Sequence, residues 1–150
     1  MEKVKVIVTA IVSSIMSWLG ILAVPVFLLV GCNVLDYITG LCAAKYRSER
    51  IDSYKGFRGI VKKVCMWLLI VVGAFVDILL TYAAEYIGLA VAVPFVVATV
   101  VAVWLIVNEI ISILENMVDI GVDMPPFLLP LVKNIKHQVE ETATVKEEQI

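Results

Sequence analysis

The chain has 150 residues and a formal net charge of only −2, while 61% of its residues are hydrophobic and its mean hydropathy is +0.99. These values lie far above those of an ordinary soluble domain, so the composition excludes a soluble globular protein and predicts an integral membrane protein. A chain of this length leaves little room beyond its membrane spans, and no segment outside them is long enough to bury a core of its own.

The first apolar stretch covers residues 4–44 and is too long for one membrane span. As a single helix it would measure about 60 Å, roughly twice the hydrocarbon thickness of a bilayer. Gly20 and Pro25 stand near its middle, and proline removes a backbone donor, so we expect the helix to break there. The sequence therefore predicts a first helix over about residues 4–21 and a second over about 25–44.

The first of these helices carries polar side chains that recur every four residues and so share one face. They are Lys5, Thr9, Ser13 and Ser17. Serine and threonine can return their hydroxyls to the helix backbone, so this face is tolerable in lipid and in water. We therefore expect a helix that either spans the membrane or lies along its interface, with a seam that either faces a pore or packs against the second helix.

A strongly basic loop follows at residues 45–63, where seven cations are opposed only by Glu49 and Asp52. The cations are Lys45, Arg47, Arg50, Lys55, Arg58, Lys62 and Lys63. Lysine and arginine collect on the cytoplasmic side of a bilayer, so the loop is predicted to be cytoplasmic. Because it is anchored between spans, we expect it to contact anionic lipid headgroups and not nucleic acid.

Two further spans are predicted over about residues 64–84 and 93–114, joined by a turn at 85–92 that lies outside the cell. Residues 1–132 would form the membrane domain, and 133–150 a polar cytoplasmic tail. Prolines at 125, 126 and 130 argue against a long helix between the last span and the tail. The polar composition of the tail itself predicts disorder. The expected fold is all-α: a polytopic membrane helical bundle of three transmembrane helices plus the N-terminal apolar helix, which assembles with copies of itself.

Ionisable residues inside the spans each cost at least a few kcal/mol near the bilayer centre and therefore require a reason. Asp77 is the deepest, and it shares a helix face with Gly73 and Thr81. Asp36 shares a face with Asn33, Gly40 and Ala44, of which the last two form a small-xxx-small pair that favours close helix approach. In the last span one polar stripe contains Asn108, Ser112, Glu115 and Asp119, with Glu109 beside it.

Three interpretations of these polar seams stay open. The seams could pack inside one bundle, with Asp36 and Glu109 paired to loop cations such as Arg58 or Lys62. They could instead face like seams on other copies, so that a ring of subunits lines a water-filled hole. A proton or ion relay within a transporter is the third, although so short a chain rarely builds a transporter alone.

The sequence contains no catalytic signature, and we predict no catalytic, cofactor-binding or metal-binding residues. The one histidine, His137, lies in the tail, and no glycine-rich phosphate loop is present. Cys32, Cys42 and Cys65 follow no metal-ligand spacing and are interpreted as small hydrophobic residues. The expected protein is not an enzyme.

Three sequence blocks, in order around the spans, resemble the bacterial toxin-secretion and phage-lysis holins, the group that includes the clostridial toxin-export holin. The blocks are Asp-Tyr-Ile-Thr-Gly at 36–40, the segment around Lys-Gly-Phe-Arg-Gly-Ile at 55–60, and Asn-Glu-Ile-Ile-Ser-Ile-Leu-Glu-Asn at 108–116 with Pro-Pro-Phe-Leu at 125–128. The resemblance covers roughly residues 26–130. Its motif and assembly candidates are Asp36, Thr39, Gly40, Ser53, Gly56, Gly59, Lys62, Asp77, Asn108, Glu109, Ser112, Glu115, Asn116, Gly121 and Pro126.

This resemblance implies a small non-enzymatic protein of the bacterial cytoplasmic (inner) membrane, multi-pass, with a cytoplasmic C-terminus and no cofactor. Such a protein oligomerises and opens pores or lesions that release cell-wall hydrolases or toxins. Its partners would be copies of itself, the lipid bilayer and an antiholin. Two alternatives stay open: a small ion channel or transporter subunit with an intramembrane acidic site at Asp77, and an antiholin-like regulatory membrane protein.

Overall fold

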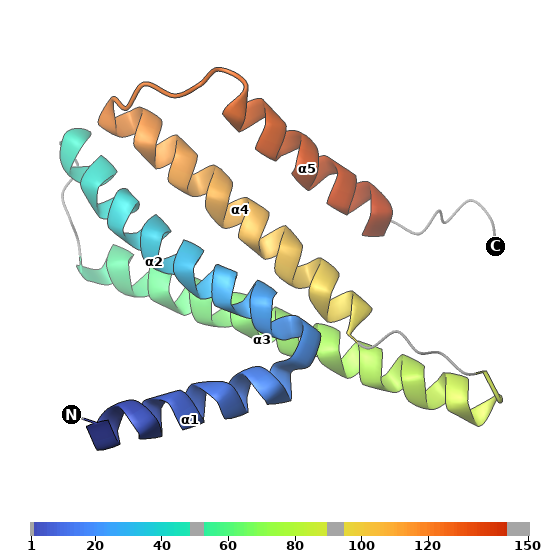
Figure 1. Ribbon diagram of the computed structural model, residues 1–150. Coiled ribbons are helices and arrows are strands. Elements are labelled where there is room, and N and C mark those ends of the chain that lie inside the picture. Colours follow the sequence, from blue (N-terminus) through green and yellow to red (C-terminus); the bar gives the residue numbers. More distant parts are fainter. Residues whose placement is uncertain (1, 49–52, 90–94, 144–150) are drawn as a thin grey trace.

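The computed structural model describes residues 2–48, 53–89 and 95–143, and all regular secondary structure in these ranges is helical (Figure 1). The elements are α1 (Glu2–Leu19), the short 3-10 helix η1 (Gly20–Leu22), α2 (Ala23–Tyr46), α3 (Ser53–Tyr86), α4 (Val96–Ile120) and α5 (Leu128–Ala143). The predicted all-α class is confirmed.

Three segments are long and apolar enough to cross a membrane: Gly20–Tyr46, Gly56–Tyr86 and Val96–Ile120. They correspond to α2, α3 and α4, as the sequence predicts. Among the described residues, α1 does not meet the same criteria of length and composition. Whether α1 spans the membrane or lies along its interface stays a prediction.

The chain breaks between α1 and α2 where glycine and proline predict it. Gly20 adopts a φ of +53°, a left-handed conformation that glycine reaches without strain. Pro25 lies in the first turn of α2, where its missing backbone donor costs little. α1 diverges from the other helices beyond this break (Figure 1), and the described side chains from Glu2 to Ser17 are exposed.

α4 is the central helix of the bundle and contacts α2, α3 and α5. One apolar core joins Leu29 of α2 and Ile70 of α3 to Ala98, Ala102 and Leu105 of α4. The two alanines are fully buried, and their small side chains allow the neighbouring helices to approach α4 closely.

Two helices extend beyond their predicted ends. α3 already begins at Ser53, so most of the expected basic loop is helical, and residues 49–52 lie outside the described ranges. The basic stretch from residue 53 contains no proline, and its lysines and arginines favour helix. α4 continues to Ile120, where Gly121 (φ +88°) ends it and the Val122 N–H bonds the Met117 carbonyl at 3.0 Å.

The tail differs most from the sequence prediction. Residues expected to be disordered form most of α5, so the prediction is wrong for 133–143, while 144–150 lie outside the described ranges. Pro130 stands in the first turn of α5, where it does not interrupt the helix. Val132 is buried in an apolar cluster with Val107 and Leu114 of α4, and this burial supports a helix that composition alone does not predict.

Candidate functional site

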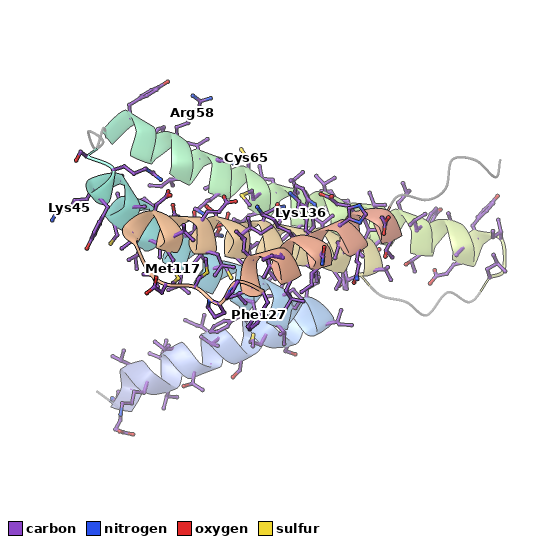
Figure 2. All side chains as sticks on the ribbon, turned by 90° about the horizontal axis from the view of Figure 1, so that it is seen from above. Lys45, Arg58, Cys65, Met117, Phe127 and Lys136 are labelled. Carbon is purple, nitrogen blue, oxygen red and sulfur yellow. The ribbon has the colours of Figure 1, made fainter. Side chains whose placement is uncertain are left out.

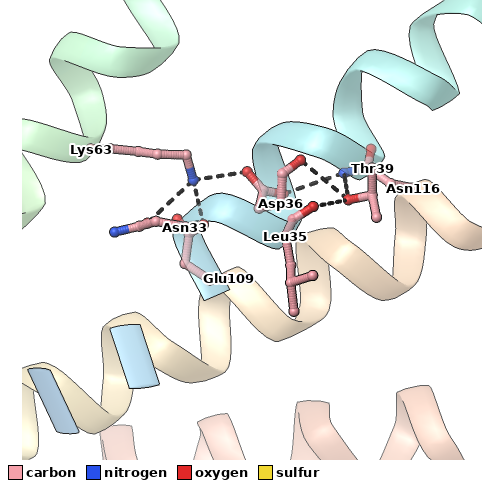
Figure 3. Close-up of polar contacts among 7 residues, drawn as sticks. All are labelled: Asn33, Leu35, Asp36, Thr39, Lys63, Glu109 and Asn116. Carbon is pink, nitrogen blue, oxygen red and sulfur yellow. Dashed lines mark hydrogen bonds and ion pairs between the residues drawn. The ribbon is translucent and has the colours of Figure 1, made fainter. Parts of the chain in front are cut away.

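Polar side chains from three helices meet inside the bundle around one lysine. This group, called the Lys63 cluster below, consists of Asn33, Asp36 and Thr39 from α2, Lys63 from α3, and Glu109 and Asn116 from α4 (Figure 3). Lys63 reaches from α3 towards the facing sides of α2 and α4. The cluster therefore joins all three membrane-length helices at one point.

Lys63 holds two carboxylates together. Its Nζ donates to Asp36 Oδ2 at 2.8 Å and to Asn33 Oδ1 at 3.3 Å, and it also bonds Glu109 Oε2. The side chains of Lys63 and Asp36 are 18% and 17% exposed, and that of Glu109 is 7% exposed. An ammonium with three donors is thus matched by three acceptors from two different helices.

Asn116 completes the cluster on the side away from Lys63. Its Nδ2 donates to Asp36 Oδ1 and to Thr39 Oγ1, both at 3.3 Å, so both oxygens of Asp36 are bonded. Thr39 Oγ1 in turn donates to the Leu35 carbonyl at 2.9 Å. Gly40 lies beside Asn116, but a Cβ there would stand an ordinary 3.6 Å from Nδ2, so this glycine is not required by close packing.

The Lys63 cluster lies within the spans, nearer to their basic end. Asp36 and Glu109 stand about 15 Å from the ends of α2 and α4 that lie on the side of the basic segment, at 1.5 Å per residue. A charge that is buried between helices and loses its partner costs several kcal/mol. The cluster can persist there because each charge faces an opposite charge, and both oxygens of Asp36 are hydrogen-bonded.

Asp77 caps the beginning of α4. It is 7% exposed, and its Oδ1 and Oδ2 accept the backbone N–H groups of Val97 and Ala98 at 2.9 and 2.8 Å. The first N–H groups of a helix have no partner within that helix, and a carboxylate there is favoured by the helix dipole. One turn earlier, Gly73 lies so close to α4 that an added Cβ would stand 2.9 Å from Ala98 Cα.

Asp77→Asn should leave membrane insertion intact, because the change removes a charge from an apolar span. We expect a loss of stability of about 1 kcal/mol, as for a weakened helix cap, and a shifted onset of permeabilisation in cells. Thermal unfolding in detergent and the time of dye entry at equal protein level measure both effects. Glu85→Gln, an exposed change on the same helix, is the control. Unaltered stability and timing in Asp77→Asn would remove this residue from the mechanism.

The other predicted residues lie outside the Lys63 cluster. On α4, Asn108 Nδ2 donates to the Trp104 carbonyl of its own helix at 3.0 Å, and Glu115 pairs with Lys133 of α5 at 3.5 Å. Ser112 is half-buried, and Gly121 ends the helix. The first three turns of α3 contain Ser53, Gly56, Gly59 and Lys62. Pro126 is exposed and precedes α5.

The polar seam of α1 is exposed along its length. Its members, Lys5, Thr9, Ser13 and Ser17, are all exposed, and this face does not pack against α2 in the described structure. The packing alternative therefore receives no support, and a pore-facing role for the seam stays a prediction.

The site prediction left out Lys63, although it expected a cation of the basic segment to pair with Asp36 and Glu109. The structure shows such a pairing, but Arg58 and Lys62, the cations named as examples, are exposed. The helical period of α3 contained a signal that Lys63 faces the bundle interior. Five residues of α3 recur at three- and four-residue steps and face α4: Lys63, Met66, Ile70, Gly73 and Asp77.

The arrangement provides hydrogen bonds and ion pairs between helices. Among the described residues, no three histidine, cysteine or acidic side chains are placed to hold a metal ion. Cys32, Cys42 and Cys65 are free thiols. The two buried acids, Asp77 and Glu109, are occupied by backbone N–H groups and by Lys63.

Sequence comparison assigns this helical membrane protein to a family. The profile of the bacteriophage holin family matches residues 13–137, from within α1 to within α5, and so includes the Lys63 cluster and Asp77. The chain belongs to the bacteriophage holin family. The resemblance to holins is thereby confirmed, and with it a membrane location.

Individual relatives of this chain occur in Clostridium perfringens and Listeria monocytogenes. It is 31% identical to Uncharacterized protein CPE0383 of Clostridium perfringens (strain 13 / Type A) over 126 residues, which cover 83% of this chain and 85% of the relative. It is 34% identical to Uncharacterized protein Lmo0128 of Listeria monocytogenes over 99 residues, or 66% of this chain and 62% of that relative. A third relative, the Uncharacterized 14.9 kDa protein in nagH 3'region of Clostridium perfringens, is 30% identical over 83% of this chain and 87% of its own length. No solved structure matches the chain significantly.

Proposed function

We propose that this holin assembles with copies of itself in the bacterial cytoplasmic membrane and opens pores or lesions that release cell-wall hydrolases or toxins. The proposal rests on one observation above all. In the most apolar stretches of α2, α3 and α4, only 22%, 17% and 33% of the residues are buried within the chain. Large apolar surfaces therefore remain for lipid and for other subunits, while the polar groups that hold each subunit together lie inside.

The intramembrane acids support a holin over an ion channel or transporter subunit. A solute site requires ligating atoms that are free to exchange partners. Both oxygens of Asp77 instead accept backbone N–H groups, and Asp36 and Glu109 share Lys63. These acids already have structural partners, so they are not available as ligands for a transported solute.

Inducible expression in a bacterium tests the proposed function. We expect an abrupt loss of the membrane barrier, in which an impermeant dye enters and a cytoplasmic reporter enzyme leaves at the same time. The same cells without inducer provide the baseline. Saturable flux of one small solute without enzyme release would favour a transporter. A harmless protein that delays lysis by a second holin would favour an antiholin.

The orientation of the subunit is part of the proposal. Lys45 and Arg58 lie towards the same end of the bundle (Figure 2), and Arg47 pairs with Asp119 there, so we place this end in the cytoplasm beside anionic headgroups. In a cysteine-free background, Gly88→Cys should react with an impermeant maleimide added outside intact cells, whereas Ser53→Cys should not. The reverse pattern would overturn this orientation.

A further inference from the structure

α5 is held on α4 by both apolar and polar contacts. Val132 is buried against Val107 and Leu114, and the Trp104 indole N–H donates to Glu140 Oε1 at 2.8 Å. The Lys136 ammonium lies 5.7 Å from the centre of the Trp104 ring, within the range of a cation–π interaction. Seen from above, α5 lies over α4 with Lys136 on it (Figure 2).

This contact follows a membrane-length helix over much of its depth. Near the basic end of the bundle, Lys133 pairs with Glu115. Near the other end of α4, Thr142 and Thr99 line the same groove. The stretch of α4 from Leu114 to Thr99 measures about 22 Å, roughly three quarters of the hydrocarbon thickness. Docked α5 therefore lies at the depth of the bilayer core.

The outward face of docked α5 is charged and cannot face lipid. The side chains of Lys133, His137 and Glu141 are 54%, 70% and 68% exposed, and Asn134 and Gln138 are exposed beside them. A lysine or acidic side chain within the bilayer core costs energy, about 2.5–3.5 kcal/mol at its centre even on the most lenient scale. Docked α5 therefore requires water on its outer side.

The face of α4 beneath α5 has the opposite character. Val100, Val103, Val107 and Leu114 make it apolar, so it is well suited to lipid if α5 leaves. Undocked α5 carries apolar residues on one face and charges on the other, as a helix at the membrane surface does. The position of α5 is thus coupled to whether lipid or water meets this side of the bundle.

We propose that α5 lines the water-filled opening of the assembled holin while docked on α4, and lies on the membrane surface when the subunit is dispersed in lipid. This inference rests on the proposed pore-forming function. Subunits that surround water would turn α5 inwards, with Lys133, His137 and Glu141 in contact with the lumen. The apolar outer surfaces of α2 and α3 would then remain available to lipid and to neighbouring subunits.

A crosslink between α4 and α5 tests the docked state. The full chain, with its three cysteines replaced by alanine, carries Val107→Cys and Val132→Cys and is reconstituted into phosphatidylethanolamine–phosphatidylglycerol vesicles that contain a dye. A short, membrane-permeant bifunctional thiol reagent is added after insertion. We expect the crosslink to form and dye release to stay within about twofold of the uncrosslinked protein. Val107→Cys with Glu141→Cys, on the opposite face of α5, should not crosslink.

Two results would overturn the proposal. If crosslinked, inserted protein stops releasing dye, α5 must leave α4 for the membrane to open. If release proceeds but no crosslink forms in the inserted protein, α5 is not docked in the open state. If even the protein without introduced cysteines releases no dye, the proposed function itself fails, while the crosslink still reports whether α5 docks.

A second measurement asks directly whether the outer face of α5 meets the lumen. Attaching a bulky, charged thiol reagent to His137→Cys should slow dye release at least threefold, because the added group narrows the opening. The same reagent on Leu79→Cys, a 66% exposed position of α3, should leave release unchanged. Equal release from modified and unmodified His137→Cys would contradict a lumen-facing α5.

Discussion

Lys63→Met is expected to lower the free energy of unfolding by about 3–5 kcal/mol, the typical cost of removing one partner from a buried ion pair. The substitution keeps an unbranched side chain of similar length but leaves Asp36 and Glu109 without their common cation. Thermal unfolding in detergent micelles and the steady-state amount of protein in membranes measure the effect. The control is Lys62→Met, which changes the preceding, exposed lysine and should be nearly neutral.

The same cluster allows a rescue experiment. Adding Asp36→Asn and Glu109→Gln to Lys63→Met removes both stranded charges and should recover much of the lost stability, because neutral amides can still hydrogen-bond. Recovery would identify charge balance, and not the shape of the lysine, as what the cluster requires. If Lys63→Met is as stable as Lys62→Met, the cluster does not hold the three helices together.

The membrane spans could be predicted from sequence because length and hydropathy are sufficient to define them. Three apolar segments of membrane length, and the break near Gly20, follow from composition and from the backbone properties of glycine and proline. The helix ends were less predictable. α3 continues to Ser53 because nothing in the basic segment stops a helix once the span supports it.

The Lys63 cluster could be predicted only in part. Placing Asp36 and Glu109 on inward faces needs no more than the helical period, and their need for a cation follows from their depth. Choosing among seven cations requires the register between α2 and α3, which the sequence of either helix alone does not contain. Lys63 is the last cation before the apolar run and lies on the stripe that includes Ile70 and Asp77. Its position on this face was the available indication that it is the partner of the two acids.

α5 was missed because average composition hides periodicity. The tail is polar overall, yet Leu128, Val132, Ile135 and Val139 recur at four-, three- and four-residue steps and share one face. That face packs on α4, so tertiary contact stabilises a helix whose composition alone predicts disorder. The role of Asp77 was likewise hidden, because capping depends on where α4 begins relative to α3.

Gly73→Ala and Gly59→Ala are expected to change stability in opposite directions, although both replace a glycine within α3. At position 73 the new Cβ would stand 2.9 Å from Ala98 Cα and 3.1 Å from its nitrogen. These are backbone atoms that cannot rotate away, so α3 and α4 must separate, at a cost of about 1–3 kcal/mol, as for other overpacked sites. The same movement lengthens the bonds from Asp77 to Val97 and Ala98 and weakens the cap of α4.

At position 59 a Cβ meets nothing within 4 Å, so alanine should stabilise the helix by up to about 1 kcal/mol through its higher helix propensity. Thermal unfolding of both variants in the same detergent gives the two signs directly. Dye release should follow them, with Gly73→Ala altered in onset and Gly59→Ala close to the parent, because only the first disturbs the α3–α4 crossing. Equal unfolding temperatures for the two variants would show that α3 and α4 do not approach as closely as Gly73 and Ala98 require.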